Sequence, residues 1–291
     1  MYHLLKKYKL LSLHLMVVIL GLTGVFGKLI SLDTIHLVWY RMGIAFVSLA
    51  LFLLFKKQLF SISKHNFFGL LGVGALVTLH WLCFFQSIKV SNVSVAVVCL
   101  ATASLFSALI EPLFFKRRLL AYEVIMGIIV LVALAFIMGT DTQYVWGYFY
   151  GIMAALLGTL FTLFNAKYIN KLGAAQITMI EMLAGVIIIS LLLLLQQDYA
   201  VFTTLISATD LTYLVILGIV CTALVFVWMT EIMRHITPYS LIMAINMEPI
   251  YSILLALLIF KDSELMSPSF YIGGSIIIGV IFLEGYLKNK Q

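Results

Sequence analysis

A carboxylate in the middle of an apolar run is the first residue in this sequence that could do chemistry. The stretch Ala244–Ser252 reads AINMEPIYS, so Glu248 and Asn246 stand among residues that prefer a dry environment. In a membrane helix, a charged side chain at the centre costs about 2.5–3.5 kcal/mol on insertion scales, and one that persists there is a candidate functional residue. Glu248 could bind an amine or hydroxyl of a substrate, or it could take up and release a proton.

Pro249 directly follows this carboxylate. A proline inside a helix has no N–H group for the carbonyl four residues earlier, here that of Ile245, and its ring tends to kink the helix. We therefore expect a helix bend at Pro249, with free carbonyl groups beside Glu248. Irregular backbone is tolerated in a membrane where it lines a cavity. The structural alternative is that Glu248 is protonated or pairs with a neighbouring helix and only stabilises the bend.

Four further polar or aromatic positions could contribute to a cavity. Arg41 could snorkel to the interface, pair with another helix, or act as counter-ion to Glu248 or to an anionic substrate. His80 could face a cavity or make a buried hydrogen bond, and its imidazole titrates near neutrality. Trp81 and Trp228 could pack, lie at the membrane interface or stack on a substrate.

Uncharged hydrogen-bonding groups extend this set. Asn165 and Thr102 could bind substrate, although amides and hydroxyls also tie membrane helices together. Glu181 is a weaker candidate, and Glu231 precedes Arg234 by three residues, which is a helical pairing distance. The predicted substrate-binding residues are Glu248, Asn246, His80, Trp81, Arg41, Asn165, Thr102 and Trp228, with Glu248 also the candidate for proton coupling.

The elements that must position these residues follow from composition. Hydrophobic residues make up 64% of the 291 positions and charged residues 10%, against roughly 45–50% and about 25% in a globular domain. A membrane-spanning helix needs about 20 apolar residues, and long apolar runs exclude an outer-membrane barrel. We predict an all-α polytopic membrane protein with ten transmembrane helices, at 11–30, 34–55, 67–85, 93–115, 122–139, 147–169, 176–195, 211–233, 239–260 and 270–286.

The basic residues predict the sidedness of these helices. Cytoplasmic loops of membrane proteins carry an excess of Lys and Arg. With the N-terminus inside, the cytoplasmic segments hold Lys6, Lys7, Lys9, Lys56, Lys57, Lys64, Lys116, Arg117, Arg118, Lys167, Lys171, Arg234, Lys288 and Lys290, and the outer segments hold Lys28, Lys89 and Lys261. We therefore expect a multi-pass protein of the cell inner membrane with both termini cytoplasmic.

The net charge of +6 is thus explained by topology, and it does not indicate nucleic acid as a partner. The expected partners are the lipid bilayer and a small-molecule substrate. Cys83, Cys99 and Cys221 fall within the predicted helices at no metal-like spacing, which favours buried thiols over a disulfide or a zinc site. We expect no metal and no cofactor.

An internal repeat indicates how the helices are organised. The pattern Ser107-x-Leu109-x-x-x-Leu113-x-Phe115-Lys116 recurs 145 residues later as Ser252-x-Leu254-x-x-x-Leu258-x-Phe260-Lys261. A unit of five helices enters the membrane from the opposite side the second time, so the two halves are inverted. We predict a first five-helix repeat at residues 1–143 and an inverted second repeat at residues 144–291. Inverted repeats with a site near the midplane are typical of secondary transporters.

The residues around the repeats carry a resemblance. The segments Ile236–Ser240 (ITPYS) and Asn246–Tyr251 (NMEPIY), with degenerate counterparts at Val90–Ser94 and Ala103–Phe106, resemble the EamA-type transporters of the drug/metabolite transporter superfamily. The resemblance covers essentially the whole chain. It implies two five-helix halves around a central cavity, alternating access to the two membrane faces, and export of a small metabolite such as an amino acid.

Other functional classes find less support in the sequence. There is no His-Glu-x-x-His pair, Gly-x-Ser-x-Gly turn or aspartate cluster for an intramembrane enzyme. There is also no Gly-x4-Gly-Lys-Ser/Thr loop for an ATP-driven pump. A channel or facilitator for small solutes remains the alternative, because inverted halves can enclose a pore. The sequence therefore predicts a secondary transporter, with no enzymatic activity.

Overall fold

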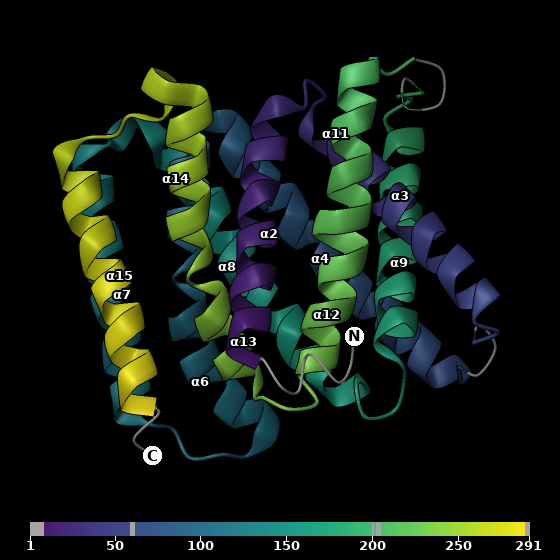
Figure 1. Ribbon diagram of the computed structural model, residues 1–291, viewed down its shortest axis with the longest axis horizontal. Coiled ribbons are helices and arrows are strands. Elements are labelled where there is room, and N and C mark those ends of the chain that lie inside the picture. The colour runs from purple at the N-terminus through teal and green to yellow at the C-terminus, as the bar shows by residue number, and fades with distance from the viewer. Residues whose placement is uncertain (1–8, 59–61, 200, 202–204, 289–291) are drawn as a thin grey trace.

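The computed structural model describes residues 9–58, 62–199, 201 and 205–288, and every regular element in these ranges is a helix. Ten of the helical segments are long and apolar enough to cross a membrane. Figure 1 shows them as an upright bundle in which α2 begins and α15 ends at the same face. We call this the terminal face and the opposite one the distal face. Large apolar side chains such as Phe55 and Leu195, both more than 80% exposed, cover the outside, as expected of a lipid-facing surface.

The first repeat begins at the terminal face and makes five crossings. Its elements are α2 (Lys9–Leu29), α3 (Thr34–Phe55), α4 (Lys64–Val90), α5 (Val93–Leu100) continued by α6 (Ala103–Phe115), and α7 (Ala121–Thr140). After the short η1 (Thr142–Tyr144), the second repeat starts at the distal face. Its elements are α8 (Val145–Tyr168), α9 (Ala174–Leu195), α11 (Ala208–Gly218), η2 (Ile219–Leu224), α12 (Val225–Ile232), α13 (Pro238–Ile245), α14 (Glu248–Phe260), η3 (Lys261–Glu264) and α15 (Pro268–Lys288).

Polar side chains start several of these helices by accepting hydrogen bonds from their first N–H groups. Asp33 accepts from the N–H of His36 at the start of α3, and Asn92 accepts from the N–H of Val95 at the start of α5. At the start of α13, Thr237 does the same and Pro238 occupies the first turn, where its missing N–H costs nothing. The sequence thus places helix starts at the membrane faces.

The fourth crossing of each repeat is broken at the same position. Helix α5 ends at Leu100 and α6 starts at Ala103, while α13 ends at Ile245 and α14 starts at Glu248, 145 residues later in both cases. We expected a bend only in the second repeat, at Pro249. The break in the first repeat contains no proline, and there the hydroxyl of Thr102 donates to the Cys99 carbonyl at 2.7 Å. In both repeats, a helix starts within the membrane.

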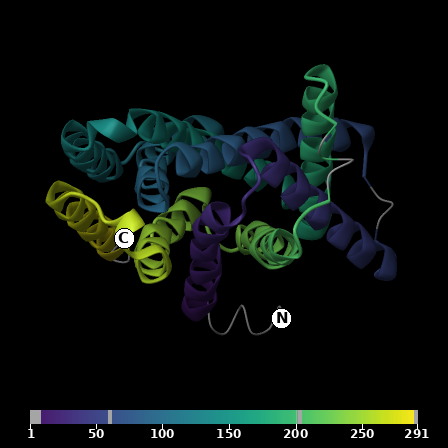
Figure 2. The same ribbon diagram turned by 90° about the horizontal axis from the view of Figure 1, so that it is seen from above.

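The repeats pack reciprocally across the middle of the molecule. Helix α2 packs on α14 of the other repeat, and α8 packs on α5 and α6. Glycines allow these approaches: a Cβ on Gly21 would lie 3.1 Å from that of Tyr251, and a Cβ on Gly151 would lie 2.6 Å from that of Cys99. At the edges, α3 pairs with α9 and α7 pairs with α15. Figure 2 shows α7 and α15 side by side at one edge. The two inverted halves therefore enclose a shared centre.

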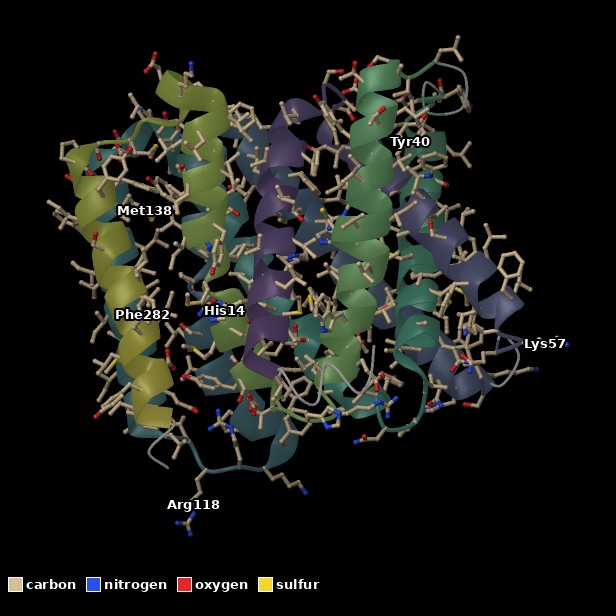
Figure 3. The ribbon with its side chains drawn as sticks, in the orientation of Figure 1. His14, Tyr40, Lys57, Arg118, Met138 and Phe282 are labelled. Carbon is tan, nitrogen blue, oxygen red and sulfur yellow. The ribbon has the colours of Figure 1, made fainter. Side chains whose placement is uncertain are left out.

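The described basic loops gather at the terminal face. Arg118, in the loop between α6 and α7, and Lys57, just after α3, point outward there in Figure 3. The predicted pair Glu231 and Arg234 is confirmed, with Arg234 Nε 3.1 Å from the Glu231 carboxylate. The three cysteines are free thiols, as the sequence predicted.

Candidate functional site

A cavity lies between the two repeats, where the broken crossings meet the first and third helices. The space open to the centres of water-sized groups is about 80 Å³, several times the 10–15 Å³ that one water needs. Its walls come from both repeats and from seven crossings. They are formed by Leu20, Thr23, Arg41, His80, Trp81, Phe84, Leu100, Ala103, Ala155, Gly158, Thr159, Phe161, Thr162, Phe226, Met229, Ile242, Ile245, Asn246 and Glu248. The cavity is therefore larger than a single water site.

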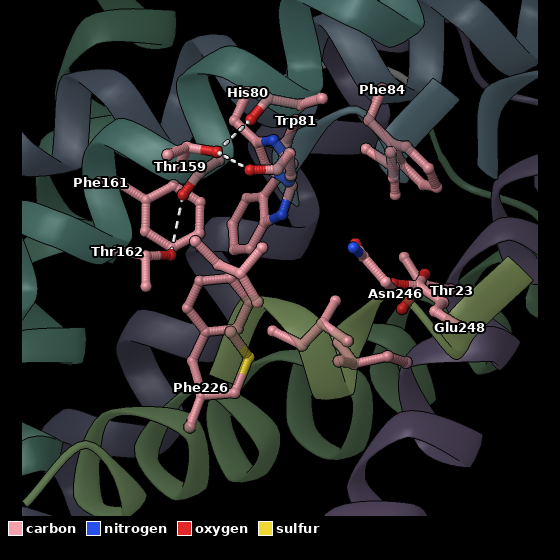
Figure 4. Close-up of a pocket in the computed structure, with 18 of the residues that line it drawn as sticks. Thr23, His80, Trp81, Phe84, Thr159, Phe161, Thr162, Phe226, Asn246 and Glu248 are labelled. Carbon is pink, nitrogen blue, oxygen red and sulfur yellow. Dashed lines mark hydrogen bonds between the residues drawn. The ribbon is translucent and has the colours of Figure 1, made fainter. Parts of the chain in front are cut away.

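Glu248 reaches this cavity because α13 ends two residues before it. It is the first residue of α14 and is 5% exposed. A carboxylate is favourable at that position, since the free N–H groups of a helix start carry partial positive charge. Pro249 occupies the first turn of the same helix, where no N–H is needed. Asn246 lies within the break, and its Nδ2 has no hydrogen-bond partner among the described residues. Figure 4 shows Asn246, Glu248 and Thr23 together on one side of the pocket.

Arg41 lines the cavity from α3. It does not reach the membrane interface, because it is 1% exposed and its guanidinium is hydrogen-bonded to a neighbouring helix. Its Nε donates to the Thr222 hydroxyl at 2.6 Å and its Nη2 to the Cys221 carbonyl at 3.4 Å. Its guanidinium lies 3.9 Å from the centre of the Trp81 ring. Nη1 keeps no partner among the described residues. The side chain is therefore fixed in place with one donor unused.

The partners of Arg41 lie on a wide helical turn that the sequence did not predict. Residues Ile219–Leu224 form a π-helix, in which the Thr222 hydroxyl also donates to the Leu217 carbonyl five residues earlier. A π turn shifts one carbonyl out of the regular α-helical ladder, and such turns are frequent at functional sites. Here the shift presents the Cys221 carbonyl to Arg41.

His80 and Trp81 both line the cavity from α4. The Nδ1–H of His80 donates to the Ala154 carbonyl at 2.7 Å, since a carbonyl can only accept. His80 thus combines the two alternatives, a wall residue that also makes a buried hydrogen bond. Trp81 packs edge-on against Phe226 at 4.9 Å, and Phe226 lies nearly parallel to Phe161 at 5.9 Å. Aromatic rings therefore form the apolar wall opposite Asn246 and Glu248 (Figure 4).

Three predicted residues lie outside the cavity wall. Trp228 is buried on α12, and its Nε1 donates to Ser12 at 3.0 Å. Thr102 satisfies a carbonyl of its own broken helix. Asn165 lies on α8 one turn beyond the wall residue Phe161 and interacts with Glu181. Trp228 thus ties two crossings together and Thr102 stabilises its own crossing, which is the structural alternative that the sequence had left open.

Several wall residues gave no usable signal in the sequence. Phe84, Phe161 and Phe226 are aromatic residues in apolar helices, where such residues most often only pack. The hydroxyls of Thr159 and Thr162 donate hydrogen bonds to backbone carbonyls one turn earlier in the same helix, at 3.0 and 2.8 Å. Only the tertiary arrangement distinguishes them from ordinary core residues. Among the described residues, no group of three or more His, Cys, Asp and Glu side chains could hold a metal ion.

Across the distal face, the two repeats are joined by buried charges. Glu264 of η3 is fully buried and accepts hydrogen bonds from Lys28 at 2.8 Å and from the N–H groups of Val93 and Ser94, both at 3.1 Å. We call these four residues the distal clasp. The carboxylate thereby caps α5 of the opposite repeat and pairs with the end of α2. The clasp closes the bundle on this side of the cavity.

A second link beside the clasp joins the same two repeats. Asp210 accepts hydrogen bonds from the N–H and hydroxyl of Ser31, at 2.9 and 2.5 Å. At the terminal face, α13 is capped by its own Thr237, and Arg117 approaches Tyr239 only as a cation over a ring at 5.6 Å. Ion pairs of Arg117 go instead to its own repeat, to Glu123 at 2.6 Å. The terminal face also has a link between the repeats, from the Gln176 amide to the Gln58 carbonyl at 2.6 Å, whereas the distal link includes the ion pair of Lys28 with Glu264.

Comparisons with known proteins agree with this architecture. The profile of the EamA-like transporter family matches residues 7–139 and again residues 145–284. No curated protein matches the chain significantly. A solved structure, described as a crystal structure of a protein, superposes with a TM-score of 0.71 at 14% sequence identity, over 93% of this chain and 95% of that chain. That identity supports the fold alone, whereas the two family matches cover nearly the whole sequence. The chain belongs to the EamA-like transporter family of membrane proteins.

Proposed function

We propose that this protein is a secondary transporter that exports a small metabolite carrying both signs of charge, such as an amino acid, by alternating access through the central cavity. One observation supports this best. Glu248 from the second repeat and Arg41 from the first both line the cavity, attract one another electrostatically and form no ion pair. Two buried charges left apart are costly, and a substrate that pairs with both offsets that cost.

The chemistry of the walls suggests how a substrate lies. An ammonium group fits the Glu248 carboxylate, which makes no hydrogen bond or ion pair with another described residue. A substrate carboxylate fits the unused Nη1 of Arg41, and the Asn246 amide supplies a further donor. The rings of Trp81 and Phe226 provide an apolar surface for a side chain. We therefore favour amino acids with apolar or aromatic side chains.

The two faces of the bundle support the proposed direction of transport. Nine of the basic residues that we assigned to the cytoplasm lie in loops or at helix ends at the terminal face: Lys56, Lys57, Lys64, Lys116, Arg117, Arg118, Lys167, Lys171 and Arg234. By the positive-inside rule this face is cytoplasmic. The distal clasp closes the outer side, and the wall residues of α8, α12 and α13 lie toward the terminal face. This arrangement supports a cytoplasm-directed state in which an exporter loads its substrate.

Counterflow in liposomes tests the proposal. Purified protein is reconstituted, the vesicles are loaded with one unlabelled amino acid from a panel, and uptake of the same labelled amino acid is followed. A carrier shows saturable uptake that the internal substrate accelerates. Uptake without acceleration indicates the channel or facilitator. No uptake of any panel member above protein-free vesicles contradicts an amino-acid carrier.

Variants of the arginine link that activity to the cavity. Arg41→Gln removes the charge that we assign to the substrate carboxylate, and hydrogen bonds to charged groups contribute about 1.5–3 kcal/mol, or roughly 10- to 150-fold in affinity. Arg234→Gln removes an arginine at the terminal face and serves as the control. Equal substrate affinity in both variants contradicts the assigned role of Arg41.

A further inference from the structure

A second group of buried polar atoms lies outside the cavity, where α9 packs against α4. Glu181 and Thr178 are fully buried and Asn165 is 2% exposed. Both carboxylate oxygens of Glu181, the Thr178 hydroxyl and the Asn165 Oδ1 have no hydrogen-bond partner among the described residues. Buried polar atoms in proteins are nearly always satisfied, so four unsatisfied oxygens on the neighbouring Asn165 and Glu181 side chains and, on the same face of α9, on Thr178 require an explanation. We call these three residues the α9 cluster.

The geometry of the helices brings the α9 cluster together. Thr178 and Glu181 are three residues apart and lie on the same face of α9. Gly74 lets α4 approach closely, because a Cβ there would lie 2.8 Å from the Glu181 Cα. The Asn165 side chain on α8 lies next to the Glu181 carboxylate. Phe161, one turn before Asn165, lines the cavity. The cluster is therefore one helical turn from the cavity, on its terminal side.

None of the neighbouring charged groups neutralises this carboxylate. On α3, Arg41 bonds to Thr222 and Cys221, and His36 pairs with Asp33 and Asp198. On α4, His80 bonds to the Ala154 carbonyl. On α12, Glu231 pairs with Arg234, and on α8, Lys167 lies over the ring of Phe114. The remaining charged residues of these helices stand at the helix ends. Glu181 thus has no described counter-ion.

We propose that Asn165, Thr178 and Glu181 form a site for a monovalent cation, either a proton or Na⁺, distinct from the substrate cavity. The donors are all oxygens, which suit hard cations. A proton on Glu181 turns an unsatisfied acceptor into a donor for the Asn165 Oδ1, and Na⁺ would instead use the oxygens as ligands. Either cation removes the uncompensated charge. This inference rests on the proposed transport function, because we assign the cation the task of driving accumulation.

A labelling experiment tests the site without transport. A hydrophobic carbodiimide adds to protonated carboxyl groups in apolar surroundings, and peptide mass spectrometry reports the extent of reaction at Glu181 and, separately, at Glu248. The purified protein is labelled over a series of pH values and Na⁺ concentrations. A proton site predicts labelling of Glu181 that decreases as pH rises and ignores Na⁺. A Na⁺ site predicts that Na⁺ at constant pH protects Glu181, whereas K⁺ does not.

Variants of the other two oxygens show whether the three residues act together. Asn165→Ala and Thr178→Val should shift the pH or Na⁺ concentration at half-labelling of Glu181 and leave the labelling of Glu248 unchanged. Labelling of Glu181 that is absent throughout, or independent of pH and Na⁺, overturns the proposal. So does half-labelling that neither variant shifts.

Transport assays then distinguish a failure of the proposed cation site from a failure of the proposed transport function. In liposomes with an imposed pH or Na⁺ gradient, Glu181→Gln should lose gradient-driven accumulation and retain exchange of substrate. If the wild type exchanges no amino acid while its labelling follows the expected pattern, the transport proposal fails and the cation site stands. Wild-type accumulation in Glu181→Gln means that the cation does not drive transport, which contradicts the inference.

Discussion

At the scale of single residues, the proposed function depends on polar groups that the fold leaves without partners. Glu248, Asn246 and Arg41 line the cavity, and the Asn246 Nδ2 and Arg41 Nη1 have no hydrogen-bond partner among the described residues. Most other polar side chains in the helices, such as Thr102 and Trp228, satisfy a neighbouring helix and stabilise the bundle. Burial alone does not distinguish the polar residues at the cavity wall from those that stabilise the bundle. Their hydrogen-bond partners do distinguish them.

Replacing Glu248 by glutamine should separate substrate binding from proton coupling. The substitution keeps the volume and fixes a neutral group. If the carboxylate binds the ammonium group, substrate affinity in counterflow falls roughly 10- to 150-fold, the amount expected for a charged hydrogen bond. If it carries the coupled proton, exchange survives and pH-driven accumulation is lost.

Glu231→Gln is the matched control, since it changes a carboxylate at the terminal face that pairs with Arg234. It should affect neither affinity nor accumulation. If Glu248→Gln and Glu248→Ala both transport like the wild type at normal abundance, Glu248 has a structural role only.

At the scale of elements, the broken crossings decide where polar atoms meet the cavity. Both breaks begin a helix near the middle of the membrane, and the two repeats achieve this differently. In the first repeat, Ser104 donates to the Ala101 carbonyl at 2.9 Å. Its counterpart 145 residues later is Pro249, which lacks an N–H. The proline therefore reinforces a break that the fold also makes without it.

Substitutions of Pro249 can test this interpretation. Pro249→Ser copies the first repeat and should keep the break, so we expect transport near that of the wild type. Pro249→Ala supplies an N–H without a hydroxyl and favours a continuous helix, which should slow transport more than it reduces folded protein. Stability should change by about 1 kcal/mol or less, since the first turn does not require an N–H. Transport rates and the amount of folded protein are compared. Equal losses of both would make Pro249 an ordinary folding requirement.

At the scale of the whole molecule, alternating access requires the two faces to open in turn. The distal clasp is one of the described connections between the repeats at the distal face, and it includes an ion pair. Glu264→Gln removes the charge that holds Lys28 and caps α5, a loss of about 1.5–3 kcal/mol for hydrogen bonds to a charged group. We expect the distal face to open more often.

Accessibility of the cavity can measure that opening. Thr23→Cys places a thiol in the wall, in a background where Cys83, Cys99 and Cys221 are replaced. A membrane-impermeant maleimide added from the distal side should react faster when Glu264→Gln is also present. Asp262→Asn on the same short element serves as the control. An unchanged rate would show that the clasp does not limit opening.

Topology is a further whole-molecule prediction. Reporters fused after Arg118 and Lys290 should report the cytoplasm, and those after Asp141 and Glu264 the outside, because cytoplasmic loops retain Lys and Arg. The structure places Arg118 at the terminal face (Figure 3). Asp141 follows the end of α7 at the distal face. A cytoplasmic signal after Glu264 would contradict the proposed orientation.

The sequence by itself determined the class of the protein. Ten apolar runs, the basic residues and the repeat at a spacing of 145 predicted a helical membrane protein of two inverted halves, because hydropathy and helix length act locally along the chain. It also singled out Glu248, Asn246, His80, Trp81 and Arg41, since polar and aromatic groups in a membrane are few.

Only the tertiary structure decided which of the polar residues face a common space. Arg41 could have snorkelled, but the π turn at Thr222 and the ring of Trp81 hold it at the cavity. Asn165 was expected in that cavity and lies beside Glu181 instead. In a uniformly apolar helix, the sequence does not mark which face meets lipid and which meets another helix. That orientation depends on contacts between segments more than a hundred residues apart.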